Sequence, residues 1–174
     1  IILETDNVYN TQVIESISKI SDSIQNIDGI SSVSSLTNII NIKADDEGIE
    51  VGKLVDPYNI PTSQEDFLKL KENINANKLY KDVIVSEDET SALIMFYLAE
   101  DADVKGVAAE IIHTTDRLQL DETLYFAGSP MLVSYISDLM RNDLTKLLPI
   151  AFLVIAIVLF LSFRSWTGVV LPLL

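Results

Sequence analysis

The chain has 174 residues, with 12 basic and 26 acidic side chains, a net charge of −14 and 48% hydrophobic residues. This composition excludes collagen-like chains and low-complexity disorder. The sequence contains no cysteine, which excludes disulfide scaffolds, zinc–thiolate sites and cysteine nucleophiles. A strongly acidic surface repels phosphate, so nucleic acid is not an expected partner.

Charged and apolar residues lie in different parts of the chain. Residues 1–143 hold all 26 acidic residues and ten of the twelve basic ones, which gives this segment a net charge of −16. Residues 147–163 carry no charge at all. The sequence therefore predicts an acidic domain over residues 1–143, followed by a membrane segment.

The apolar segment has the length of a membrane helix. Residues 144–163 would form a helix of roughly 30 Å, the thickness of the hydrocarbon core of a bilayer. Its apolar residues lie on every face, which favours a membrane helix over a buried helix of a soluble core. Pro149 lies in the first turns, where a missing backbone donor is tolerated. We therefore predict a transmembrane helix over residues 144–164.

The flanks of this helix predict its orientation. Arg164 and Trp166 follow the apolar run and favour the cytoplasmic side, so residues 1–143 are expected on the extracytoplasmic side. Residues 165–174 turn apolar again and are expected to form a short cytoplasmic turn and the start of a next membrane helix. Because the chain also begins at Ile1 without a methionine, we expect a fragment of a multi-pass plasma membrane protein, whose remaining segments would be its partners.

The acidic domain is predicted to alternate strands and helices. Apolar residues recur every three or four positions over residues 10–27, which predicts an amphipathic helix. Asn7 or Asn10 is its expected cap, and Gly29 follows its end. The remaining elements expected before residue 77 are strands over 1–4, 30–36, 39–42 and 49–55, a polar turn over 44–48, and a helix over 63–76 whose Thr62 and Glu65 have capping-box spacing.

The second half of the domain is predicted to begin with a β-hairpin. Its strands would be residues 83–85 and 92–98, joined by the polar residues 86–91. Gly128, Ser129 and Pro130 would then open a helix, with Ser129 as N-cap and Pro130 at the first position. No breaker separates this helix from the membrane segment. Between hairpin and turn we expect a helix over 103–118 and a strand over 124–127.

This order of elements predicts the fold class. Without an inserted strand and helix, it is the split βαββαβ pattern of ferredoxin-like domains. We therefore expect an α+β domain followed by a transmembrane helix.

Few residues could carry enzyme chemistry. His113 is the single histidine and lies within a predicted helix, so no second imidazole or thiolate completes a transition-metal site. Ser129 lacks the Gly-x-Ser-x-Gly frame of a hydrolase nucleophile, and a role in starting the helix is the better interpretation. The acidic runs at residues 45–48 and 87–89 do not fit EF-hand spacing and are interpreted as solvated turns. We therefore expect a binding or coupling domain, with no enzyme activity and no cofactor.

Four stretches of the chain carry a family resemblance. They are a Gly-Ile strand over residues 29–37, a Leu-Tyr and Val-Ser-Glu-Asp hairpin over 79–88, an Ala-Gly-Ser-Pro turn at 127–130, and a helix over 144–163 that ends in Phe-Arg-Ser before an early Leu-Pro. In this order they resemble the first porter domain and second membrane helix of resistance-nodulation-division (RND) transporters. The similarity is greatest to the hydrophobe/amphiphile-exporter branch, which includes MmpL-type and hopanoid-exporter-like proteins. The residues that carry the motif are Gly128, Pro130, Phe163, Arg164 and Pro172.

The resemblance implies a function. Such a protein is an exporter driven by the proton-motive force, with a porter domain that handles hydrophobic or amphiphilic, lipid-like substrates. Its partners would be the bilayer, the substrate and the rest of the chain, and a homo-oligomer is left open. One departure is Glu89, where family members often carry glycine or another small turn residue.

Two alternatives belong to other functional classes. A lipid sensor or a protein-translocation or assembly module could share the membrane plan without pumping, and a membrane-buried acidic residue in a later helix would favour the pump. An acylphosphatase-like enzyme on a ferredoxin-like fold would need a phosphate-binding loop. Arg117 and Arg141 lie instead on predicted helices, with no glycine-rich loop beside them.

Overall fold

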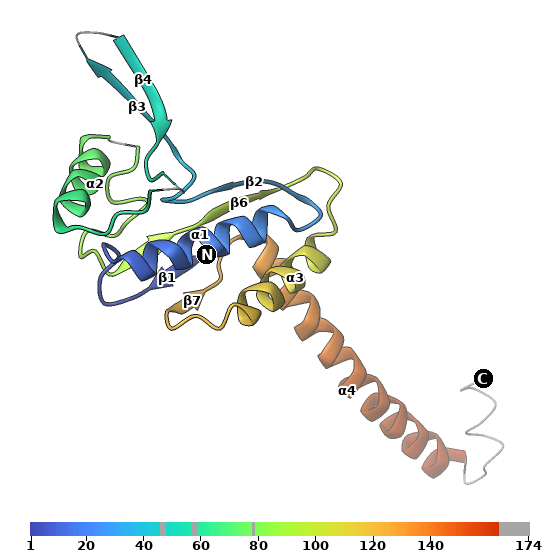
Figure 1. Ribbon diagram of the computed structural model, residues 1–174. Coiled ribbons are helices and arrows are strands. Elements are labelled where there is room, and N and C mark those ends of the chain that lie inside the picture. The colour runs from blue at the N-terminus through green and yellow to red at the C-terminus, as the bar shows by residue number, and fades with distance from the viewer. Residues whose placement is uncertain (46–47, 57–58, 78, 164–174) are drawn as a thin grey trace. The chain divides into compact units, whose positions relative to one another are not determined.

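A computed structural model describes residues 1–45, 48–56, 59–77 and 79–163 (Figure 1). These residues form four helices and seven strands, which confirms the mixed helix-and-strand class. The chain divides into two compact units, Ile1–Leu132 and Val133–Leu174. The predictions for Arg164, Pro172 and the segment 165–174 lie outside the described residues.

Helix α1 (Thr11–Gln25) forms because its apolar residues recur at helical spacing and its start is capped. The side chain of Asn10 accepts a 2.9 Å hydrogen bond from the backbone N–H of Gln12, so Asn10 is the cap of the two candidates. Asn7 instead accepts a hydrogen bond from the backbone N–H of Tyr9. The buried face of the helix consists of Val13, Ile14, Ser16, Ile17, Ile20, Ser21 and Ile24.

Gly29 lies between α1 and the next strand, as expected, and has a φ of +88°. A Cβ atom at this position would lie 2.9 Å from Cγ2 of Val107 and 3.1 Å from the Cβ of Ala102. Glycine is therefore required both by the left-handed backbone and by the close approach of these two side chains.

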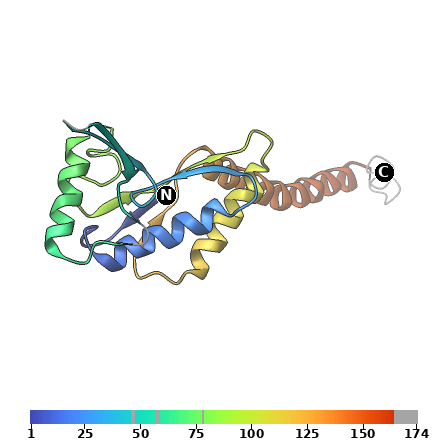
Figure 2. The same cartoon turned by 45° about the horizontal axis from the view of Figure 1, so that its top comes forward.

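Strand β1 (Ile2–Glu4) lies between β5 (Ser91–Leu93) and β7 (Thr123–Tyr125) and is antiparallel to both. Strand β2 (Ile30–Ser34) pairs antiparallel with β6 (Met95–Leu98). Helices α1 and α3 (Val104–Arg117) pack side by side on one face of these strands (Figures 1 and 2).

The core lies between these helices and strands. Leu3 lies opposite Ala92 on one side and Leu124 on the other, and its side chain is fully buried. Ile17 of α1 and Ile111 of α3 are also fully buried. Each such side chain contributes about 1.5–3 kcal/mol relative to an exposed position, so this core is the main source of the unit's stability.

A short chain of buried hydroxyl groups joins α1 to the segment after β2. The Ser21 hydroxyl donates to the Ile17 carbonyl at 2.7 Å, and its oxygen lies 2.8 Å from the Ser35 hydroxyl, with which it forms a second hydrogen bond. The oxygens of Ser35 and Thr37 lie 3.2 Å apart. Because all three hydroxyl groups are buried, these hydrogen bonds replace the hydrogen bonds to water that the groups lose on folding.

The segment between β2 and β5 contains two strands and a helix, at the places of the strands expected over 39–42 and 49–55 and of the helix expected over 63–76. Strands β3 (Ile40–Asp45) and β4 (Gly48–Lys53) pair antiparallel with each other, and among the described residues they pair with no other strand. Helix α2 (Gln64–Ala76) follows them.

The predicted capping box of this helix is displaced by one residue. The Ser63 hydroxyl accepts from the backbone N–H of Asp66, whose carboxylate accepts from the backbone N–H of Ser63. Thr62 and Glu65 therefore do not form the box. Aspartate substitutes for glutamate in the reciprocal bond, which the sequence pattern does not favour.

The predicted hairpin of residues 83–85 and 92–98 is confirmed only next to its turn, where the N–H of Ser86 donates to the carbonyl of Ser91 and the N–H of Leu93 donates to the carbonyl of Ile84. The two segments meet at one bridge, between Val85 and Ala92. Asp82 has a φ of +59°, and the preceding residues form tight turns, so the chain becomes extended too late for a longer ladder. The segment 91–98 pairs instead with β1 and β2.

Helix α4 (Ser129–Phe163) is continuous over 35 residues, with Pro149 inside it. The N–H of Leu132 donates to the carbonyl of Gly128 at 3.1 Å. This places the cap at Gly128, one residue before the predicted cap Ser129, and puts Pro130 in the first turn. Among the described residues, α4 is the one helix long and apolar enough to cross a membrane.

Candidate functional site

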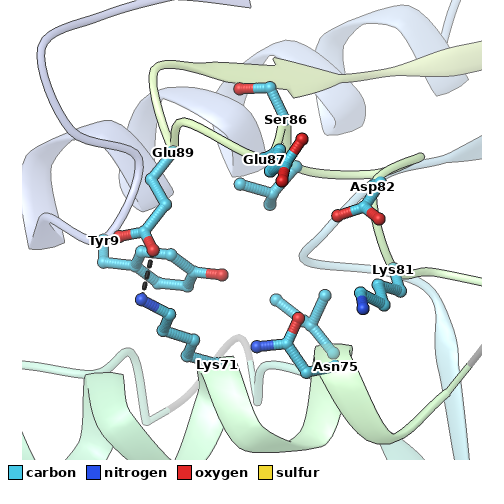
Figure 3. Close-up of a pocket in the computed structure, with 10 residues that line it drawn as sticks. Tyr9, Lys71, Asn75, Lys81, Asp82, Ser86, Glu87 and Glu89 are labelled. Carbon is cyan, nitrogen blue, oxygen red and sulfur yellow. Dashed lines mark hydrogen bonds and ion pairs between the residues drawn. The ribbon is translucent and has the colours of Figure 1, made fainter.

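Tyr9 and several residues of the segment 71–89 line a cavity of about 320 Å³ (Figure 3). Tyr9 comes from the loop before α1, and Lys71 and Asn75 come from α2. The other walls are residues 81–82 and the turn 85–89. The cavity therefore lies between the inserted helix and the rest of the first unit.

One wall of the cavity is an ion pair beside an aromatic ring. The Lys71 ammonium donates a hydrogen bond to Oε1 of Glu89. Its nitrogen also lies 6.0 Å from the centroid of the Tyr9 ring, within range of a cation–π interaction. Burial, together with the nearby Glu89 carboxylate, raises the pKa of Tyr9 to about 12, so its hydroxyl is protonated at neutral pH.

The opposite wall presents groups of both charges. Lys81, Asp82, Asn75 and Glu87 point their polar ends toward the space between α2 and the turn, as Figure 3 shows. All four side chains belong to exposed residues. The cavity can therefore offer hydrogen-bond donors and acceptors, with ammonium and carboxylate groups, to a polar group of a ligand.

The turn that carries Glu89 is fixed by its own hydrogen bonds. A carboxylate oxygen of Asp88 accepts from the hydroxyls of Ser86 (2.6 Å) and Thr90 (2.8 Å) and from the backbone N–H of Thr90. The hydroxyl bonds from Ser86 and then Thr90 lower the pKa of Asp88 below its ordinary value. Glu87, Asp88 and Glu89 were expected to form a solvated turn, and Asp88 and Glu89 have these additional roles.

A larger groove of about 1000 Å³ runs along the start of α1 and the loop 118–123. Most of the charged side chains that line it are acidic, and one oxygen of Glu122 is buried without a hydrogen-bond partner. This groove is unsuited to an anionic ligand because its field is negative. The acidic residues are Glu4, Asp6, Glu15, Asp121 and Glu122.

The motif residues are not brought together at one site. Gly128 and Pro130 lie at the start of α4, and Phe163 is its last residue. They are therefore separated by the length of the helix, roughly 50 Å. Gly128 has a φ of +103°, which explains why glycine occupies the position.

The apolar side chains of α4 remain exposed. From Leu144 to Leu161, the large hydrophobic side chains other than the partly buried Leu159 have exposed fractions between 43% and 71%, so the described part of the chain does not cover them. A helix that exposes apolar side chains along this length is stable in a bilayer and not in water.

Residues considered for enzyme chemistry lie on surfaces. His113 is exposed on α3, and Ser129 is exposed at the start of α4. Within the described ranges, no group of three or more His, Cys, Asp or Glu side chains could hold a metal ion.

The sequence analysis did not find the cavity of Figure 3. Its walls come from four segments, and neither periodicity nor spacing relates them. One indication of this site is present in the sequence: Glu89 stands where related proteins often carry glycine or another small turn residue.

Comparison with known proteins gives one family. The family model described as "MMPL family" matches residues 5–174. No curated protein and no solved structure was found to match the chain.

Proposed function

Because this chain belongs to the MMPL family of RND-type membrane transporters, we propose that it is part of an exporter of hydrophobic or amphiphilic, lipid-like substrates driven by the proton-motive force. The observation that carries the proposal is helix α4. It starts directly after the last strand of the first unit and continues over 35 residues, with exposed apolar side chains along its second half.

We propose that the first unit is a ferredoxin-like porter domain. One residue, Ile94, separates β5 from β6, and it exchanges two backbone hydrogen bonds with Ile1. If residues 91–98 are one strand, the strand order is β7-β1-β5/β6-β2 with antiparallel neighbours. A strand antiparallel to both β1 and β2 then lies between them, which supports the split βαββαβ arrangement.

We further propose that residues 1–143 lie on the extracytoplasmic side of the plasma membrane and that the transmembrane part of α4 covers residues 144–163. The charge of −16 before the helix supports this orientation. Because residues 1–174 contain no cysteine, Glu100→Cys introduces one labelling site into this segment, and the parent protein without the substitution is the control. The Glu100→Cys variant should react with a membrane-impermeant maleimide in intact cells, and labelling only after lysis would contradict the orientation.

In this proposal α4 transmits movement between the membrane and the porter domain. Inserting a Pro-Gly pair after Asp138 would interrupt the helix outside the predicted membrane segment. Transport by the complete protein should be lost while the porter domain stays folded. The same insertion in the loop 99–103 is the control, and undiminished transport after the helix insertion would refute this coupling role.

A non-pumping lipid sensor or a protein-translocation or assembly module remains the alternative. It would bind its lipid or protein partner without coupled movement. We propose a binding and coupling role in preference to an enzyme. Arg117 lies at the end of α3 and Arg141 within α4, far apart in sequence and on separate helices.

A further inference from the structure

Glu89 occupies a backbone conformation that disfavours its own side chain. Its φ is +63°, in the left-handed region where glycine is preferred. Strain of this kind persists where the surrounding structure fixes the residue, and it is frequent at ligand clamps and switch regions. We therefore expect the side chain of Glu89 to make an interaction that offsets the strain of its backbone.

Two hydrogen bonds hold the backbone of Glu89 in place. Its N–H donates to the carbonyl of Ser86 at 3.0 Å, and its carbonyl accepts from the N–H of Val8 at 2.9 Å. These bonds hold Glu89 to its own turn and to the loop before α1. From this fixed backbone its carboxylate accepts a hydrogen bond from the Lys71 ammonium of α2.

The pair between Lys71 and Glu89 joins segments that are 18 residues apart in sequence. The pairs Glu15–Lys19 and Glu65–Lys69 instead join exposed side chains four residues apart on a single helix. The Lys71 and Glu89 side chains are also less exposed, at 43% and 33%.

Helix α2 has few other attachments to the first unit. Of its 13 residues, Leu70 and Ile74 are buried, and the partly buried Phe67 packs against the core. Near its start, the Thr11 hydroxyl donates to the carbonyl of Pro61 at 2.8 Å. A helix with so little buried surface is expected to open locally more easily than α1, which buries seven residues.

We propose that α2 is a movable lid over the cavity of Figure 3 and that the ion pair between Lys71 and Glu89 holds this lid closed. Opening the pair releases α2 from the turn and gives a ligand access to the partly buried Tyr9, beside the already exposed Asp82 and Glu87. The need for this carboxylate explains why Glu89 replaces a small residue at a strained position. The inference does not depend on the direction or energy source of transport.

Amide hydrogen exchange of the whole chain in lipid nanodiscs tests the lid. Lys71→Met keeps the apolar stem and removes the charge, and Glu89→Gln is a second, nearly isosteric variant. Exchange over residues 64–76 should become about three- to tenfold faster in both, with α1 unchanged. Lys69→Met, which breaks the exposed pair on the same helix, is the matched control. Equal exchange in Lys71→Met and Lys69→Met would overturn the proposal.

Two further variants test whether Glu89 holds α2 closed or only stabilises its own turn. Glu89→Gly relieves the strained backbone, so it should leave α1 protected while α2 exchanges faster. Unchanged exchange of α2 in this variant would mean that Glu89 has no role in closing the lid. The charge-swapped double variant K71E/E89K should return α2 to slow exchange, and failure to do so would also count against the pair.

Discussion

The backbone N–H of Leu132 donates a 3.1 Å hydrogen bond to the carbonyl of Gly128, and this bond begins helix α4. Gly128 has a φ of +103°, so the chain turns from β7 into the helix through a conformation that only glycine adopts readily. This junction is the sequence link between the strands of the first unit and the apolar helix.

Gly128→Ala should therefore lower the free energy of unfolding of the first unit by about 1–3 kcal/mol, because alanine is strained at this φ. The protection of the slowest-exchanging amides of α1 measures this change. Gly52→Ala in β4 is the control, since no atom lies within 4 Å of an added Cβ there, and its φ is not in the left-handed region. If both variants are equally stable, the backbone argument at Gly128 is wrong.

Ser63→Ala should destabilise α2 by about 1 kcal/mol, because Ser63 caps the helix and pairs reciprocally with Asp66. Thr62→Ala changes the neighbouring residue, which was the cap expected from the sequence, and should have little effect. Hydrogen exchange over residues 64–76 distinguishes the two variants. A larger effect of Thr62→Ala would support the capping box read from the sequence.

Ser21→Ala should destabilise the first unit by about 1 kcal/mol, because Ser21 connects α1 to the buried hydroxyl of Ser35. Ser18→Ala, at a partly buried position of the same helix, is the control. Thermal unfolding of the two variants should show the lower midpoint for Ser21→Ala. Equal midpoints would mean that the hydroxyl network contributes nothing.

Tyr9 should ionise at higher pH than an exposed tyrosine. Burial, then Glu89, raises its pKa from 10.0 to about 12. Its contribution to stability is therefore complete below pH 10 and is lost as the pH rises through about 12. Ultraviolet absorbance titration should show Tyr9 ionising near pH 12, and Tyr9→Phe should remove this contribution. Persistence of that transition in Tyr9→Phe would assign it to another residue.

Local patterns predicted the regular helices well. The recurrence of apolar residues located α1 and α3 to within two residues, and the missing breaker before Lys146 predicted that α4 is continuous. These elements are set by neighbours in sequence and by capping groups. The N-caps of α2 and α4, Ser63 and Gly128, each lie one residue from the predicted cap. At both places several neighbouring polar or small residues could cap the helix.

Pairing between distant segments was harder to predict. Residues 83–85 and 92–98 have the composition of a hairpin, yet β1 and β2 pair with the second segment. The composition of a strand gives no information about its partner, because backbone hydrogen bonds are the same for every residue except proline. The cavity beside Glu89 was missed for the same reason, since its walls meet only through the tertiary fold.

The most direct test of the proposed exporter uses the complete protein in proteoliposomes. A pH gradient is imposed, and proton flux and the movement of a fluorescent amphiphile are recorded together. We predict that the amphiphile moves with the protons and that a protonophore stops both movements. Binding of the amphiphile without gradient-dependent movement, in vesicles with verified reconstitution and over a range of amphiphiles, would contradict the exporter and favour the sensor or assembly module.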